Sequence, residues 1–122
     1  MNLYKKFKGI EEIKNYSSII FKVICNYEML NEITDGYKFV HVEKYQTNDN
    51  KIKILGECNI TKKIIYITME GHNNFSQLID TWAHEISHIA ILEHGKEHTK
   101  LKNAIKKLIK AYIDCNFENI AA

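Results

Sequence analysis

Residues 74–95 read NFSQLIDTWAHEISHIAILEHG, and this stretch decides the fold expected of the chain. Its apolar residues recur every three or four positions, which predicts one amphipathic helix over residues 75–93. Asn74 stands where a helix N-cap is favoured, and Gln77 follows three residues later to reach back toward it. Gly95 occupies the place of a left-handed residue just after the helix. The stretch therefore predicts a capped helix with one buried face.

Residues 84–88 within this helix read HEISH, an HExxH motif. Histidines at positions i and i+4 are about 40° apart around a helix and about 6 Å apart along it, so His84 and His88 can bind one tetrahedral metal ion. Glu85 lies beside that face and can contact a water molecule at the metal. We therefore expect a metal-assisted hydrolase in which Glu85 takes a proton from water.

A catalytic zinc ion needs a third protein ligand, and the candidates all follow the motif. They are His94, His98, Asp114 and Glu118. If the helix continued unbroken, His94 would lie about 9 Å beyond His88 along the axis and on another face. The chain must therefore bend after His88 if His94 is a ligand, and the alternatives stay open on spacing alone.

The segment after the motif resembles a known group of zinc enzymes. Residues 84–98 read HEISHIAILEHGKEH, which is similar to the active-site segment of the SprT-like and WLM zinc metallopeptidases, where HExxH is followed by His-Gly or His-Asp. The resemblance covers residues 55–100. The metzincin pattern HExxHxxGxxH has the same histidine spacing, but Ile91 stands where that pattern has glycine. The SprT-like and WLM group is the better match.

This resemblance implies a minimal zincin-like zinc metallopeptidase whose substrate is a peptide or protein. It implies a Zn2+ ion held by His84, His88 and His94, with Glu85 as the general base. Position 98 carries a histidine where the family commonly has an aromatic residue. His98 therefore stays open as a spacer, an outer hydrogen-bond donor or the third ligand itself.

Outside this segment the hydrophobic pattern changes from helical to strand-like and back. A period of three to four predicts a helix over residues 10–33. A period near two, rich in β-branched residues, predicts three strands between residues 37 and 69. A further amphipathic pattern predicts a helix over residues 97–117. The expected fold is α+β: an N-terminal helix, a three-stranded antiparallel sheet, the HExxH helix and a C-terminal helix.

The last predicted strand, residues 64–68, directly precedes the metal-binding helix. We expect it to be an exposed edge of the sheet beside the cleft, where an extended peptide substrate could pair with its backbone. His72, in the loop that follows, is expected at the surface. The lysines of the C-terminal helix are expected to form a solvated face.

The composition and charge exclude several classes of protein. With 122 residues, 45% of them hydrophobic and 26% charged, residues 1–122 are expected to form a single soluble domain. Every one of the 17 basic residues is a lysine, so the chain lacks the guanidinium group that reads guanine and clamps phosphate. The net charge of +2 is small. We therefore expect nucleic-acid binding to be absent, or weak and nonspecific.

The cysteines and the hydropathy pattern bear on the compartment. Cys25, Cys58 and Cys115 are odd in number and widely spaced, which favours a reducing environment over a disulfide framework. We see neither a signal peptide nor a membrane segment and expect a cytoplasmic protein. The oligomeric state stays open. The alternative function is a non-catalytic zincin-fold module that binds or regulates a protein partner.

Overall fold

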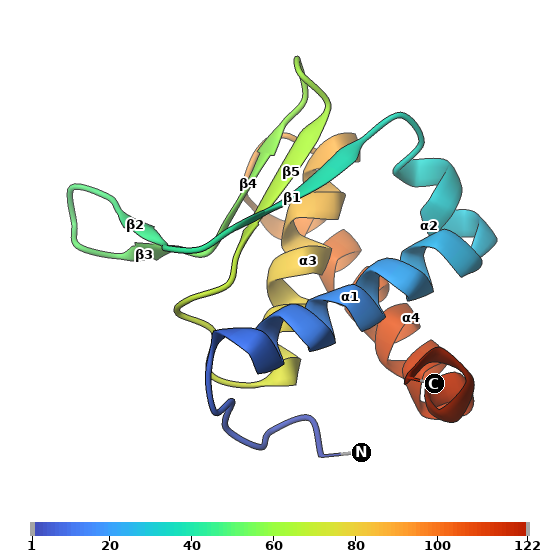
Figure 1. Cartoon of the computed structure of the whole chain (residues 1–122). Helices are drawn as coiled ribbons and strands as arrows, with labels where there is room; N and C mark the ends of the chain where they lie inside the picture. The colour runs from blue at the N-terminus through green and yellow to red at the C-terminus, as the bar shows by residue number, and fades with distance from the viewer. Residues whose placement is uncertain (1, 122) are drawn as a thin grey trace.

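The computed structural model describes the backbone of residues 2–121 and the side chains of residues 2–116. Within these residues the fold is α+β, as expected: helices pack on one face of a small sheet, and a short hairpin projects from it (Figure 1). None of the described helices has both the length and the hydropathy to cross a bilayer. In chain order the elements are α1 (Ile10–Asn26), α2 (Glu28–Ile33), β1 (Lys38–Val42), β2 (Gln46–Thr47), β3 (Lys53–Ile54), β4 (Gly56–Asn59), β5 (Ile64–Thr68), α3 (Phe75–Ala90) and α4 (Lys96–Ala121).

The main sheet is mixed, and the expected three-stranded antiparallel arrangement is wrong in this respect. Its strand order is β1-β5-β4, with β4 antiparallel to β5 but β1 parallel to β5 in the register Lys38↔Ile64 to Val42↔Thr68. After β1 the chain leaves the sheet to form the separate antiparallel hairpin β2–β3. It then returns as β4 on the far side of β5, which is why β1 and β4 are not neighbours.

The expectation that residues 64–68 form an edge is also wrong. β5 has exactly these bounds, but it is the central strand, and its inward side chains Ile65 and Ile67 are fully buried. β4 forms the edge that lies closest to α3. Any backbone pairing of a peptide beside the HExxH helix would therefore involve β4.

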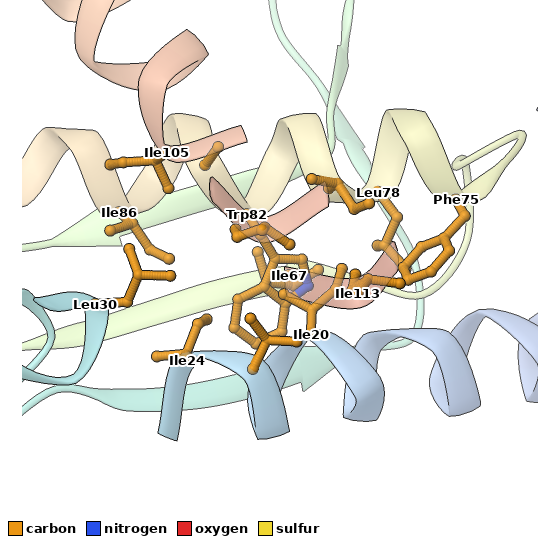
Figure 2. Close-up of a cluster of buried hydrophobic side chains, with 14 of the residues drawn as sticks. Ile20, Ile24, Leu30, Ile67, Phe75, Leu78, Trp82, Ile86, Ile105 and Ile113 are labelled. Atoms are coloured by element: carbon orange, nitrogen blue, oxygen red, sulfur yellow. The ribbon is translucent and has the colours of Figure 1, made fainter. Parts of the chain in front are cut away.

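Trp82 is at the centre of the core, and it fixes α3 against both the sheet and α1. Its ring stacks on Phe39 of β1 at 4.9 Å between centroids, and its Nε1–H donates a hydrogen bond of 3.0 Å to Ser17 Oγ of α1. Figure 2 shows the indole surrounded by aliphatic side chains from the sheet and the neighbouring helices, among them Ile20 and Ile67. A large side chain buried in this way contributes about 1.5–3 kcal/mol. The helix with the motif is thus held from its inner face.

The helix boundaries agree with the expected ones at some positions, including Asn74, and differ at others, and α4 runs over Lys96–Ala121 instead of residues 97–117. The helix expected over residues 10–33 divides at Tyr27, whose extended backbone separates α1 from α2. Asn74 is the N-cap of α3, as predicted, because its side chain accepts the Gln77 N–H at 2.8 Å. The helix ends at Ala90 instead of residue 93. Gly95 therefore does not end α3 but precedes α4, where its carbonyl accepts the first-turn N–H of Thr99 at 3.0 Å.

Candidate metal centre

Three imidazole nitrogens lie close together at the C-terminal end of α3. Nε2 of His88 lies 3.2 Å from Nε2 of His84 and 3.1 Å from Nε2 of His94, and the remaining side of this triangle is 3.3 Å. His84 and His88 come from successive turns of α3, whereas His94 comes from the connection to α4. The structure therefore brings all three expected ligands close enough to bind one metal ion.

The triangle is better explained by metal binding than by hydrogen bonding. Each imidazole nitrogen has one in-plane site, which holds either a hydrogen or a lone pair. It cannot donate to one neighbour and accept from another, so three mutual N–H···N bonds cannot coexist. Tetrahedral ligands at a zinc–nitrogen distance of about 2.0–2.1 Å are about 3.3 Å from one another. The sides of the triangle are close to this value, and imidazole is a good ligand for zinc and related ions.

The predicted bend between His88 and His94 is confirmed, and its structure is local. α3 ends because Ile91 adopts an extended conformation, φ −132° and ψ 103°. The Ile91 carbonyl oxygen then lies 2.9 Å from Nδ1 of His88. Because a carbonyl only accepts, Nδ1 of His88 carries the hydrogen and Nε2 keeps its lone pair. The bend therefore brings His94 to the site and also sets the tautomer that a metal requires.

His84 and His88 are held in the uncharged form that binds metals. Burial, helped by the neighbouring imidazoles of His98, His88 and His94, lowers the pKa of His84 to about 4. Burial also lowers the pKa of His88. At neutral pH a metal ion therefore does not have to displace a proton from either of these rings.

Glu85 follows His84 on α3 and packs against Gly56 at the start of β4. Its side chain is buried, with 6% exposed. Glycine at position 56 of β4 leaves room for this side chain, because a Cβ there would lie 3.0 Å from both Cγ and Oε2 of Glu85. Burial and, to a smaller extent, the nearby Glu57 raise the pKa of this carboxyl to about 7. A carboxyl with such a pKa can both take and return a proton near neutral pH.

A cleft of about 430 Å3 adjoins these groups. One wall is α3, with Asp80, Thr81, His84 and Glu85, and His94 also lines the cleft. The opposite wall is formed by the hairpin and the start of β4, from Asn48 and then continuously from Ile52 to Gly56. Sequence reasoning missed this second wall. The turn residues and the alternation of Ile52 with Ile54 signal a hairpin, but they do not show what it faces.

Of the other candidate ligands, His98 and Asp114 do not join the triangle. His98 is buried, and its Nε2 lies 3.1 Å from the His84 carbonyl oxygen. Asp114 is exposed on α4, and the side chain of Glu118 lies outside the described residues. Among the side chains that the structure describes, the potential metal-binding group consists of His84, His88 and His94.

His72 is not at the surface as expected. It is 4% exposed, and its Nε2 lies 2.8 Å from Oγ1 of Thr81 on α3. Burial lowers its pKa to about 4. His72 therefore fastens the loop before α3 to the helix as a neutral side chain.

No protein-family model, curated protein or solved structure matches this chain. These comparisons therefore identify no family for the chain. The geometry of the histidines, of Glu85 and of the cleft is the basis for a functional conclusion.

Proposed function

We propose that the chain is a zinc-dependent metallopeptidase of the zincin type, similar to the SprT-like and WLM enzymes. His84, His88 and His94 hold the metal, and Glu85 is the general base. The observation that carries the proposal is the Nε2 triangle with sides of 3.1–3.3 Å, formed on an HExxH helix with a buried carboxyl in the same cleft.

Each group has a distinct role in peptide hydrolysis. A zinc ion bound by His84, His88 and His94 would supply Lewis acidity, which would polarise a carbonyl group and make water more acidic. The Glu85 carboxylate takes a proton from the attacking water and passes it to the amide nitrogen as the C–N bond breaks. Its raised pKa suits both transfers, although a nearby dication would lower that pKa. His88, held by Ile91, keeps its lone pair toward the metal.

The proposed substrate is an extended segment of a peptide or protein. β4 is an edge strand, and Gly56 at its start lines the cleft, so a substrate backbone can pair there beside Glu85. The hairpin wall adds apolar contacts, since Ile52 is 59% exposed and Ile54 is 39% exposed. Exposed apolar side chains at a cleft favour an apolar residue in the bound peptide.

The charges near the cleft support a protein substrate over a nucleic acid. Lys102 and Lys106 of α4 form ion pairs of 3.2 Å and 3.1 Å with Asp80 of α3. Two of the lysines in the basic stretch of α4 therefore join the two helices. This leaves less positive charge for phosphate contacts.

The decisive variant is Glu85→Gln, which keeps the shape of the side chain and removes the base. We expect wild type to bind one zinc ion per chain and to cleave an unfolded protein such as casein. Glu85→Gln should keep the zinc and lose at least about 100-fold in cleavage rate. The control is Glu32→Gln at an exposed position on α2, which should behave as wild type.

Two results would contradict the proposal. The metal site is wrong if purified protein takes up no stoichiometric zinc and His84→Ala has the same metal content as wild type. If zinc is bound but Glu85→Gln changes no measured property, the chain is a non-catalytic module. Zinc content by elemental analysis and peptide release by mass spectrometry distinguish these cases.

A further inference from the structure

His98 contacts the rings of all three triangle histidines without being one of them. It lies in the first turn of α4 and is 3% exposed. Its ring stacks on His88 with 4.0 Å between centroids and 17° between planes, and it meets the His84 ring edge-on at 4.5 Å. A polar ring buried this deeply needs a hydrogen-bond partner.

That partner is the backbone of His84. The His84 carbonyl oxygen lies 3.1 Å from Nε2 of His98, and because a carbonyl only accepts, this nitrogen carries the hydrogen. The same oxygen accepts the Ser87 hydroxyl at 2.7 Å. Nε2 of His98 is therefore committed to the backbone of α3, and this nitrogen has no lone pair to offer a metal.

These contacts restrict both histidines of the motif. The stacked His98 ring covers one face of the His88 imidazole, while the Ile91 carbonyl holds its Nδ1. The hydrogen bond to the His84 carbonyl ties the start of α4 to the turn of α3 that carries the first ligand. Since His94 lies in the short connection between these helices, the same tie limits where His94 can move.

We propose that His98 is a positioning residue that preorganises the metal site, through its ring on His88 and its hydrogen bond to the backbone of His84. This inference rests on the proposed metal site. It assigns the role that the motif left open among spacer, outer donor and ligand. Groups that orient ligands in this way typically change metal affinity by 10–100-fold when they are removed.

Three substitutions separate the two contacts. His98→Phe keeps a stacked ring and loses the hydrogen bond, His98→Gln keeps a donor and loses the ring, and His98→Ala loses both. We expect His98→Ala to weaken zinc binding by about 10–100-fold and the other two to lie between it and wild type. Zinc affinity is measured by competition with a chromophoric chelator. Thr99→Ala, at the exposed position next to His98 on α4, is the control and should stay within about twofold.

Two further measurements distinguish positioning from general stability. The thermal unfolding of each metal-free variant shows how much the fold is weakened. We expect His98→Phe to unfold near the wild-type temperature and yet bind zinc more weakly. The visible spectrum of the Co2+ protein should keep the intensity of a tetrahedral site in all three variants, because the three ligands are intact.

The outcomes separate this inference from the proposed function. If wild type binds no zinc, the metal site itself is wrong. If wild type binds zinc and His98→Ala and His98→Phe match it within twofold, only the role of His98 is wrong. The role is also wrong if the zinc affinity of the three variants falls only in proportion to their unfolding temperature. It is wrong as well if His98→Phe loses the tetrahedral Co2+ spectrum, because that loss is expected of a ligand variant. If His98→Ala fails to fold, the zinc affinities of His98→Phe and His98→Gln are compared with that of wild type. Weaker binding in both supports the role of His98, and binding within twofold in both contradicts it.

Discussion

The two walls of the cleft are built in different ways. In α3, eleven of the 16 residues are buried, the helix is capped by Asn74, and Asp80 is paired with two lysines of α4. The opposite hairpin has two paired positions on each strand, and every residue from 46 to 54 is exposed. The chemical groups lie on the wall with the fixed geometry. The wall with few supporting contacts offers side chains that can adjust to a substrate.

This difference predicts that the two walls have separate functions, and substitutions on each wall test the prediction. Substitutions on the α3 wall should change metal binding, catalysis or stability. Substitutions of the exposed hairpin residues 46–54 should change substrate affinity and little else. A hairpin substitution that changed zinc affinity or stability would show that the two walls do not have separate functions.

The largest effect is expected from His88→Ala on the α3 wall. Structural zinc sites bind the metal with about 10–16 kcal/mol, which is about 4 kcal/mol for each of three or four ligands. A loss of about 4 kcal/mol lowers the affinity about 1000-fold. We therefore expect zinc affinity to fall by about this factor, measured by chelator competition. Ile52→Ser on the hairpin is the matched comparison and should stay within twofold. An equal loss in both variants would contradict the division between the walls.

A smaller effect concerns His72, which supports α3 from the preceding loop. Burial lowers its pKa to about 4, so between pH 6.5 and 4 the unfolded chain binds a proton that the folded chain does not. The stability of the metal-free protein therefore falls as the pH is lowered, and this side chain contributes about 2 kcal/mol of loss between pH 7 and pH 5.

Urea unfolding at these two pH values tests the contribution of His72. His84 and His88 shift stability in the same direction, so the quantity to compare is the difference between pH 7 and pH 5. In His72→Gln this difference should be smaller by about 2 kcal/mol. An unchanged difference would mean that His72 titrates normally in the folded protein.

Gly56→Ala tests the packing of β4 against Glu85 and Thr81 of α3. The added Cβ would lie 3.0 Å from Glu85 Cγ and from Thr81 Cγ2, so the base must shift by a few tenths of an ångström. We expect peptide cleavage to fall by about tenfold, because small displacements of a catalytic group are costly. Zinc affinity should stay within about threefold. Gly9→Ala, where a Cβ meets open space, is the control.

The smallest effect is expected from Ile52→Ser in a cleavage assay. The Ile52 side chain is mostly exposed, so its loss should change stability by less than about 0.5 kcal/mol. We expect KM to rise about two- to fivefold for peptides with a leucine at the bound position, with kcat unchanged. Peptides with serine at that position should show little difference. A fall in kcat with constant KM would instead place the hairpin in the catalytic machinery.

The parts of the site that lie close together in sequence could be predicted. The helical period and the Asn74 cap define α3, and the i, i+4 spacing places His84 beside His88. The bend before His94 follows from the demand for a third ligand. These features depend on local geometry, which the order of residues specifies directly.

The rest depends on contacts between distant segments. The parallel pairing of β1 with β5 and the position of β4 at the edge follow from how the chain leaves the sheet and returns. The burial of His72 and His98 depends on their packing against α3, and no spacing rule shows it. For the same reason, the sequence revealed a hairpin without revealing that it forms a wall of the cleft.

Trp82 is the single tryptophan of the chain, so the intrinsic tryptophan fluorescence of the protein comes from this one side chain. Its indole is fully buried between α3, β1 and α1, on the inner side of the helix that carries the triangle histidines. Its fluorescence therefore reports whether α3 is packed on the sheet. A variant that loses zinc but keeps the native emission has a local defect at the metal centre. A red-shifted emission would instead show that the core itself has opened.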